Sequence, residues 1–326
     1  MKKILFFLMI VGTVFAKENF TVFGASPPAT YFLYSFNPKV IAGINYQFKQ
    51  RELTFIDSSI AQLPVIGGWF GQGNTPNFET LLKVQPNLVL TWNYNNGYKP
   101  VDDKLKGLGF KTYGVNIATI DDYVHLYKEV GEVLRMQKRG ERLSNYVRKA
   151  LQKVQSVKEK VQVKKVVYYA EGVDGLLTEC HASIHADLIE YVGAYNPHRC
   201  SNKIGYGRER ITAEQLMLYD PDVIITQERS FYENIYKSQR FRDIKAVKNK
   251  AVYLIPSTPF SWFDRPPSFM KILGAQWLSS LLYTDLYPNK IEKDVDAFYQ
   301  LFLNVKLNNK QIKQLLKDNN GNVLGF

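Results

Sequence analysis

The segment 141–161, ERLSNYVRKALQKVQSVKEKV, constrains the fold more than any other part of the chain. Its apolar residues recur with the period of an amphipathic helix, and neither Gly nor Pro interrupts it. Lys, Arg, Glu and Gln fill the other face, and all four favour helix formation. At 1.5 Å per residue this helix would be about 30 Å long, roughly the width of a small domain. An element of this kind can join two domains rigidly.

Two similar segments flank the helix. Residues 77–92, NFETLLKVQPNLVLTW, and residues 212–227, TAEQLMLYDPDVIITQ, each contain a Glu, a leucine-bearing helix, a Pro that ends the helix and an apolar strand. Further strands are expected at residues 39–44, 63–66, 110–115, 165–169 and 251–255. Strands that alternate with helices form parallel sheets with right-handed crossovers. The sequence therefore predicts an α/β fold with two Rossmann-like lobes joined by one long α-helix.

The first sixteen residues have the pattern of a signal peptide. Lys2 and Lys3 precede an apolar stretch at 4–11, and Val14-Phe15-Ala16 resembles a cleavage site. No Cys follows for lipid attachment, and no later apolar stretch is long enough to span a bilayer. We therefore expect an exported, soluble, periplasmic protein without a lipid anchor. The expected division is a signal peptide at 1–16, an N-terminal lobe at 17–140, a linking helix at 141–163 and a C-terminal lobe at 164–326.

The chain is basic, with a formal net charge of +12 that falls to +10 when Lys2 and Lys3 are removed. Its lysines are scattered along amphipathic helices, and an exported protein rarely meets nucleic acid, so a solvated surface is the better interpretation. We expect no nucleic-acid partner and a monomeric protein. Basic side chains that face a cleft could still attract an anionic ligand.

Cys180 and Cys200 are the only cysteines, and in an oxidising compartment we expect them to form a disulfide. The alternative is a metal site, because His181, His185 and His198 lie within or beside the same loop. His181 and His185 are four residues apart, a spacing that suits a metal ion on one helix face. Ordinary loop and helix-start roles for these histidines remain open.

In parallel sheets, ligands bind beyond the carboxyl ends of the strands. In this sequence the rule selects Trp69, Phe70, Trp92, Asn93, Tyr94, Asn116, Glu171, Gln227, Tyr232, Trp262, Phe263, Asp264 and Arg265. Arg208 and Arg210 alternate on an extended segment, and arginine suits bidentate contact with oxyanions. The predicted ligand-binding residues are Trp69, Phe70, Trp92, Tyr94, Arg208, Arg210, Tyr232, Trp262 and Arg265. We expect Trp69, Trp92 and Trp262 to form a preformed aromatic wall.

The sequence contains none of the motifs GxSxG, P-loop, HExxH or CxxC. The nearest glycine cluster, IGGWFGQG at 66–73, lacks the Lys of a phosphate-binding loop. We therefore predict a protein that is not an enzyme. An exported enzyme that uses Glu171, Asp264 or a His as acid–base remains the alternative class, and an interaction protein without a small ligand is a third.

The paired segments, the Gly-Gly-Trp-Phe loop at 67–70, AVKNKAVYLIP at 246–256 and the long helix resemble the substrate-binding proteins of ABC importers for ferric siderophores, haem and vitamin B12. The resemblance covers residues 20–305. It implies a periplasmic receptor that captures its ligand between two lobes and delivers it to a permease driven by an ATPase. It also implies that Glu79 and Glu214, the glutamates of the paired segments, dock on permease arginines.

The resemblance gives no intrinsic cofactor but implies that the bound ligand is a metal chelate. Arginine together with aromatic residues fits an anionic complex, so an iron(III)-siderophore or related iron chelate comes first. A nickel or cobalt complex that uses a His comes second. Cobalamin and oxyanions are further alternatives within the same family.

Overall fold

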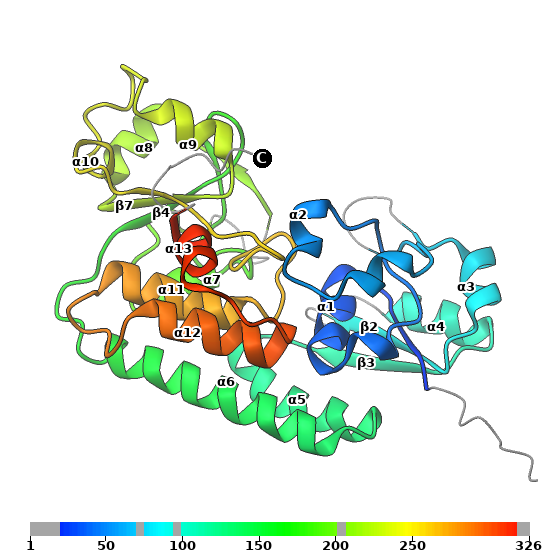
Figure 1. The fold of residues 1–326 in the computed structure, drawn as a ribbon. Coiled ribbons are helices and arrows are strands. Elements are labelled where there is room, and N and C mark those ends of the chain that lie inside the picture. The colour runs from blue at the N-terminus through cyan, green and yellow to red at the C-terminus, as the bar shows by residue number, and fades with distance from the viewer. Residues whose placement is uncertain (1–19, 70–74, 94–98, 201–206, 318–326) are drawn as a thin grey trace, which may run out of the picture.

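The computed structural model describes residues 20–69, 75–93, 99–200 and 207–317. It shows an α/β protein with two parallel sheets and one long helix that runs past both of them (Figure 1), which confirms the predicted fold class. We call residues 20–133 the N-terminal lobe and residues 167–317 the C-terminal lobe. The predicted signal peptide, residues 1–16, lies outside the described residues.

The N-terminal lobe contains a sheet in the order β1-β2-β3, with all neighbours parallel. Its strands are β1 Val22–Gly24, β2 Leu88–Asn93 and β3 Thr112–Asn116. Its helices are α1 Pro27–Phe36, α2 Gln50–Leu53, α3 Phe78–Val84, α4 Lys99–Gly107 and α5 Tyr123–Val133, with 3₁₀ turns at Pro38–Val40, Ser58–Gln62 and Ile120–Asp122.

The expected strand at 39–44 is not a continuous strand. Pro38 begins a 3₁₀ turn, which the Asn37 side chain caps by accepting a hydrogen bond from the Lys39 N–H. Isolated parallel bridges follow at Ile41 and Ile44, and they pair this segment with Val22 and Val65. The first true strand is β1, a three-residue element that the sequence pattern did not reveal.

The C-terminal lobe contains a parallel sheet in the order β4-β7-β8 and a small antiparallel pair β5-β6. Its strands are β4 Val167–Ala170, β5 Leu177–Thr178, β6 Glu209–Arg210, β7 Val223–Thr226 and β8 Val252–Leu254. Its helices are α7 Asp187–Tyr191, α8 Ala213–Tyr219, α9 Arg229–Ile235, α10 Lys245–Lys248, α11 Lys271–Leu282, α12 Ile291–Phe298, a π-helical turn at Tyr299–Leu303, and α13 Asn309–Lys317.

The two repeated segments adopt the same local structure in both lobes. Helices α3 and α8 are each seven residues long, and each begins with a side-chain cap, from Asn77 and from Thr212. Each ends at a non-glycine residue in the left-handed conformation, Gln85 in one and Asp220 in the other. A Pro and then a central strand, β2 or β7, follow. The similarity in sequence is therefore a structural repeat.

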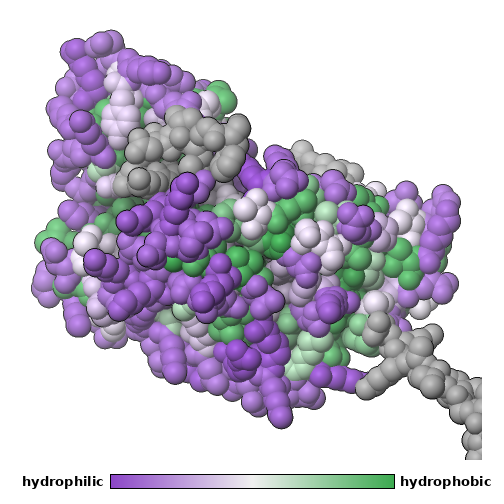
Figure 2. Space-filling model, in the orientation of Figure 1, coloured by the Kyte–Doolittle hydropathy of each residue, from purple (hydrophilic) through white to green (hydrophobic). Residues whose placement is uncertain are grey.

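The long helix is α6, Gln137–Lys158, and it contains 22 residues. It begins four residues before the expected start at 141 and ends before 163. Gly140, the residue directly before the expected start of the helix, lies inside α6. The chain leaves the helical conformation between α5 and α6 at Arg135, which adopts a left-handed φ of 58° just after α5. In the view of Figure 2, hydrophilic residues cover most of the surface formed by α6.

Gly140 is needed because α5 and α6 approach each other closely there. A Cβ built on Gly140 would lie 2.3 Å from the Tyr127 carbonyl oxygen and 3.1 Å from Cα of Gly131. Both contacts are to backbone, which cannot move aside cheaply. The glycine therefore permits the α5–α6 packing.

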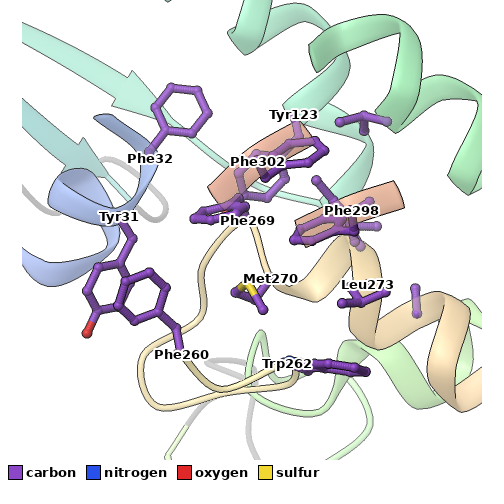
Figure 3. Close-up of a cluster of buried hydrophobic side chains, with 14 of the residues drawn as sticks. Tyr31, Phe32, Tyr123, Phe260, Trp262, Phe269, Met270, Leu273, Phe298 and Phe302 are labelled. Carbon is purple, nitrogen blue, oxygen red and sulfur yellow. The ribbon is translucent and has the colours of Figure 1, made fainter. Parts of the chain in front are cut away.

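One hydrophobic core connects the two lobes through α6. The buried face of α6, which includes Leu143, Val147 and Val154, belongs to the same cluster of buried side chains as α1 and α11. Tyr31 of α1 stacks on Phe260, which follows β8, with ring centroids 3.7 Å apart (Figure 3). The lobes are thus packed against each other and are not only tethered by a linker.

The close approach of α5 and α6 predicts the effect of adding one methyl group. Gly140→Ala should lower the free energy of unfolding by about 1–3 kcal/mol, because the added Cβ overpacks the contact with Tyr127 and Gly131. Gly107→Ala in α4 is the matched control, since a Cβ there meets nothing within 4 Å and Ala favours helix. Urea denaturation of both variants measures this, and an unchanged or raised stability for Gly140→Ala would contradict the packing argument.

Candidate functional site

The carboxyl ends of the C-terminal lobe's parallel strands converge on one group of polar residues. Glu171 follows β4, Gln227 follows β7, and the loop 256–268 follows β8. The Gln227 amide donates to the Tyr169 hydroxyl at 2.7 Å, and the Ser261 hydroxyl donates to Gln227 at 2.8 Å. The ends of three neighbouring strands are therefore tied together, at the edge where ligands bind in sheets of this kind.

A charged network lies at this edge, formed by Glu171, Glu179, Arg208, Asp264 and Arg265. Arg265 contacts Glu171 through two nitrogens, Nε to Oε1 at 2.5 Å and Nη2 to Oε2 at 3.2 Å, and it also donates to Glu179. Arg208 Nε donates to Glu171 Oε1 at 3.0 Å. Two arginines thus share one carboxylate.

The carboxylates of the network are deeply buried. Glu171 is 2% exposed, and Glu179 and Asp264 are 0% exposed. Buried carboxylates need paired and hydrogen-bonded cations, and Arg265 supplies that pairing for Glu171 and Glu179. Burial by itself would lower the pKa of Arg265, but the hydrogen bond to Glu171 and the charges of Asp264 and Glu171 outweigh it and raise that pKa.

Arg265 occupies a strained backbone conformation. Its φ is 52°, in the left-handed region that costs a non-glycine residue about 1–2 kcal/mol. The Ser261 hydroxyl accepts hydrogen bonds from the backbone N–H groups of Phe263 and Asp264, which shape the loop just before it. Strain that the surroundings hold in place is concentrated at functional sites in proteins.

His185 extends the network toward the other side of Asp264. Its Nδ1 lies 2.5 Å from Oδ1 of Asp264. The second oxygen, Oδ2, has no hydrogen bond within the described part of the chain and lies 3.4 Å from Nε of Arg265. A carboxylate bonded to one imidazole nitrogen fixes the orientation of the ring.

The structure separates the two arginines that the sequence placed together. Arg208 pairs with the buried Glu171, whereas Arg210 on β6 pairs with the exposed Asp174. The side chain of Arg210 is 62% exposed and that of Asp174 is 40% exposed. Exposed pairs of this kind contribute little. Arg208 is therefore the one that belongs to the network.

The aromatic wall is not formed as expected. Trp92 is 1% exposed and packs against Phe32 of α1, and Trp262 is 0% exposed. The cause for Trp92 is that β2 is the central strand and both of its faces are covered. Both indoles are therefore part of the core rather than of an exposed wall.

The remaining predicted aromatic residues have different environments. Trp69 is half-buried and packs edge-to-face on Phe78 at 6.0 Å between ring centroids. Tyr232 of α9 is buried in the core of the C-terminal lobe. Phe70 and Tyr94 lie outside the described residues.

Cys180 and Cys200 form the expected disulfide. The three neighbouring histidines do not cluster, since His185 contacts Asp264 and His198 contacts Tyr219 and Glu209, whereas His181 lies beside Cys200. His181 and His185 both precede α7, so they do not share a helix face. The predicted three-histidine metal site is therefore not assembled.

Sequence reasoning missed Glu179. This residue is fully buried, and it connects three parts of the site by accepting hydrogen bonds from Arg265, from the Ser183 hydroxyl and from the Gly207 N–H. It follows the two-residue strand β5, which is too short to show a pattern. Its proximity to Cys180 in the sequence is the one signal that could have drawn attention to it.

A sequence model of the family described as "Periplasmic binding protein" matches residues 69–259, more than half of the chain. The chain belongs to this family. An ABC transporter solute binding protein from Sulfurospirillum deleyianum is 34% identical and superimposes with a TM-score of 0.86 over 92% of this chain and 95% of that one. Members of the family are solute-binding transport proteins that work with a cognate ABC transporter permease.

Two further relatives are named for their ligands. The molybdate-binding protein MolA of Haemophilus influenzae is 25% identical over 257 residues, which are 71% of each chain. A structure of the vitamin B12 binding protein BtuF of Vibrio cholerae is 17% identical and has a TM-score of 0.63 over 83% of this chain and 98% of that one, a likeness that shows the fold alone. Within the described residues, no helix is long and apolar enough to cross a membrane.

Proposed function

We propose that this periplasmic binding protein captures an anionic solute between its two lobes and delivers it to the permease of an ABC importer that an ATPase drives. In this proposal the signal peptide is removed after Ala16, and the mature protein acts in the periplasm as a soluble monomer. The anion binds at the charged network, where Arg208 and Arg265 orient it.

One observation carries this proposal. In the charged network the carboxylates are inside and the guanidinium groups outside. The side chains of Arg265 and Arg208 are 31% and 39% exposed, whereas those of Glu171 and Glu179 are 2% and 0% exposed. A solute that reaches this edge meets cationic donors first. Guanidinium groups match the geometry of oxyanions, which they bind through paired hydrogen bonds.

A small metal oxyanion of the molybdate type fits this site best. MolA, which is 25% identical over 71% of this chain, is named for binding molybdate. The burial of Trp92 and Trp262 removes two of the flat surfaces that a large chelate would use. An anionic iron(III) chelate, the first choice from the sequence, is the second candidate, because the half-buried Trp69 could still stack on such a ligand.

The solute can be identified in protein purified from its own periplasm without denaturation. Elemental analysis and native mass spectrometry should detect molybdenum or tungsten in the oxyanion case. Iron together with the mass of an organic chelator would support the second candidate instead. A protein that carries no anion, and that binds neither molybdate nor a ferric catecholate in calorimetry, would refute the proposed function.

Arg208 and Arg210 offer a matched pair for testing the anion site. Arg208→Gln should weaken molybdate binding by about 30-fold or more, which corresponds to the loss of a buried charged contact of at least about 2 kcal/mol. Arg210→Gln should change the affinity by less than about threefold, because it breaks only an exposed pair. Glu171 keeps Arg265 as a partner in both variants. Equal affinities of the two variants in isothermal titration calorimetry would contradict the assignment.

Permease docking is proposed for Glu79 and Glu214. They occupy the first turns of α3 and α8, and their side chains are 76% and 69% exposed. The Glu79 carboxylate lies 2.7 Å from Lys83 Nζ, and the Glu214 carboxylate lies 3.6 Å from Arg240 Nη2. In the docked complex each carboxylate would be shared between this cation and a permease arginine. Their equivalent positions in the two repeats give the receptor one contact on each lobe.

Charge reversal separates docking from ligand binding. Glu79→Arg and Glu214→Arg should keep the affinity for molybdate but lower uptake at least about tenfold, because like charges across an interface cost several kcal/mol. The control is Glu141→Arg, which changes an exposed residue of α6. Cells with this variant should take up molybdate at the wild-type rate. Uptake of radiolabelled molybdate by cells that lack the wild-type receptor measures this. Loss of ligand affinity in the purified docking variants would place these glutamates in the binding site instead.

A further inference from the structure

An imidazole lies directly beside the disulfide of the C-terminal lobe. Nδ1 of His181 is 3.5 Å from Sγ of Cys200 and accepts a hydrogen bond from the Cys200 N–H at 3.3 Å. Because Nδ1 is the acceptor, its lone pair faces Cys200 and the proton of the neutral ring is on Nε2. The potential ligand atoms of Cys180, His181 and Cys200 all lie within 4.8 Å of one another. One ion of tetrahedral geometry could therefore reach all three.

The imidazole of His181 is partly buried and has a cation, Arg199, near it. Burial lowers the pKa of His181, and the nearby charge of Arg199 lowers it further. The positive charge of Arg199 is balanced by Glu190, whose carboxylate lies 2.9 Å from the guanidinium.

The backbone around the cysteines is held together by more than the disulfide. The backbone N–H of His181 donates to the His198 carbonyl at 2.9 Å, and the side-chain amide of Asn196 donates to the Glu179 carbonyl at 3.0 Å. These bonds join the two segments that carry the cysteines. Cleavage of the S–S bond would therefore leave the two thiols near each other and near His181.

We propose that reduction of the Cys180–Cys200 disulfide creates a binding site for a divalent transition metal ion such as Zn²⁺ or Co²⁺, with Cys180, His181 and Cys200 as ligands. A dithiol supplies two electrons and two protons, becomes a disulfide itself and leaves two protein thiols. The metal ion then displaces both thiol protons and accepts the Nδ1 lone pair. This site is separate from the charged network and does not depend on the proposed solute.

The ligand set suits these ions. Two thiolates and one imidazole match the ligand types that zinc prefers, and three protein ligands leave a fourth position open for water. To bind one tetrahedral metal ion, the two sulfur atoms would have to move apart by roughly 1.7 Å from their disulfide bonding distance. Cys180 is 1% exposed while His181 and Cys200 are partly exposed, so a metal ion can approach from one side.

Cobalt spectroscopy of the mature protein tests the proposal. The protein is reduced with dithiothreitol, freed of the reagent by gel filtration without oxygen, and titrated with Co²⁺. The reduced protein should develop sulfur-to-cobalt charge-transfer absorption and the visible bands of a tetrahedral site at one equivalent of metal. The oxidised protein should develop neither. A reduced protein that binds Co²⁺ no better than the oxidised one would overturn the proposal.

Two histidine variants distinguish a three-ligand site from a simple dithiol. His181→Ala should bind Co²⁺ at least about tenfold more weakly than the wild type after reduction. His198→Gln changes another histidine close to Cys200, one that bonds to Tyr219 and Glu209, and should bind Co²⁺ like the wild type. Equal binding by His181→Ala and the wild type would remove His181 from the site.

Reduction of the disulfide can itself destabilise the fold, so metal binding is also tested by thermal unfolding with and without Zn²⁺. Zn²⁺ should raise the melting temperature of the reduced wild-type protein, because a ligand that binds only the folded state stabilises it. Zn²⁺ should leave the melting temperature of the oxidised protein unchanged. It should raise the melting temperature of reduced His181→Ala by much less than that of the reduced wild type. The absence of a Zn²⁺-dependent rise in the reduced wild type would overturn the proposal.

Discussion

The unbroken backbone hydrogen bonding of α6 is the constraint on which the rest of the structure depends. From Glu141 to Lys158 the helix has neither Gly nor Pro, so a bend would require breaking helical hydrogen bonds without replacing them. Its apolar face is buried in a core that also contains side chains of both lobes. Receptors whose lobes are joined by loops can rotate widely, since a few residues absorb the change. Here such a rotation would also have to open the core.

Direct contacts between the lobes reinforce this constraint. Arg139 of α6 donates to the Ser35 carbonyl at the end of α1 and to the Leu301 carbonyl in the C-terminal lobe. The Tyr191 hydroxyl of α7 donates to Asp121 of the N-terminal lobe at 2.9 Å. Figure 3 shows Tyr31 and Phe260 stacked across the same boundary. The carboxyl ends of the two sheets are therefore held at a fixed separation before any ligand arrives.

The charged network uses this rigid frame. Burying Glu171, Glu179 and Asp264 is unfavourable unless cations accompany them, so the fold needs Arg265 even without a ligand. The same pairing holds Arg265 in its left-handed conformation and leaves part of its guanidinium accessible. The structural requirement and the proposed binding role thus fall on one side chain, and Arg208 is the member of the network that can be removed with less damage to the fold.

Local patterns predicted the elements, whereas contacts between distant segments determined the site. The repeated helix–Pro–strand segments and the long helix could be inferred because each depends on residues near in sequence. The disulfide could be inferred because the chain has only two cysteines. The burial of Trp92 and Trp262 could not be inferred from the sequence, because it depends on which distant segments cover each indole. The place of Gly140 inside α6 could not be inferred from local sequence, because its partner, the Tyr127 carbonyl, lies on another helix. Glu179 was missed because two of its three donors, Arg265 and the Gly207 N–H, come from distant segments.

Small-angle X-ray scattering of the mature protein tests the central claim, that α6 and the shared core hold the lobes together. The protein is stripped of solute and measured, and the measurement is repeated after addition of the solute identified in the native preparation. The stripped protein should scatter as the packed structure does, and its radius of gyration should stay almost unchanged when solute binds. A larger radius for the stripped protein, followed by marked compaction with solute, would show that the lobes separate and that α6 is not a rigid connection.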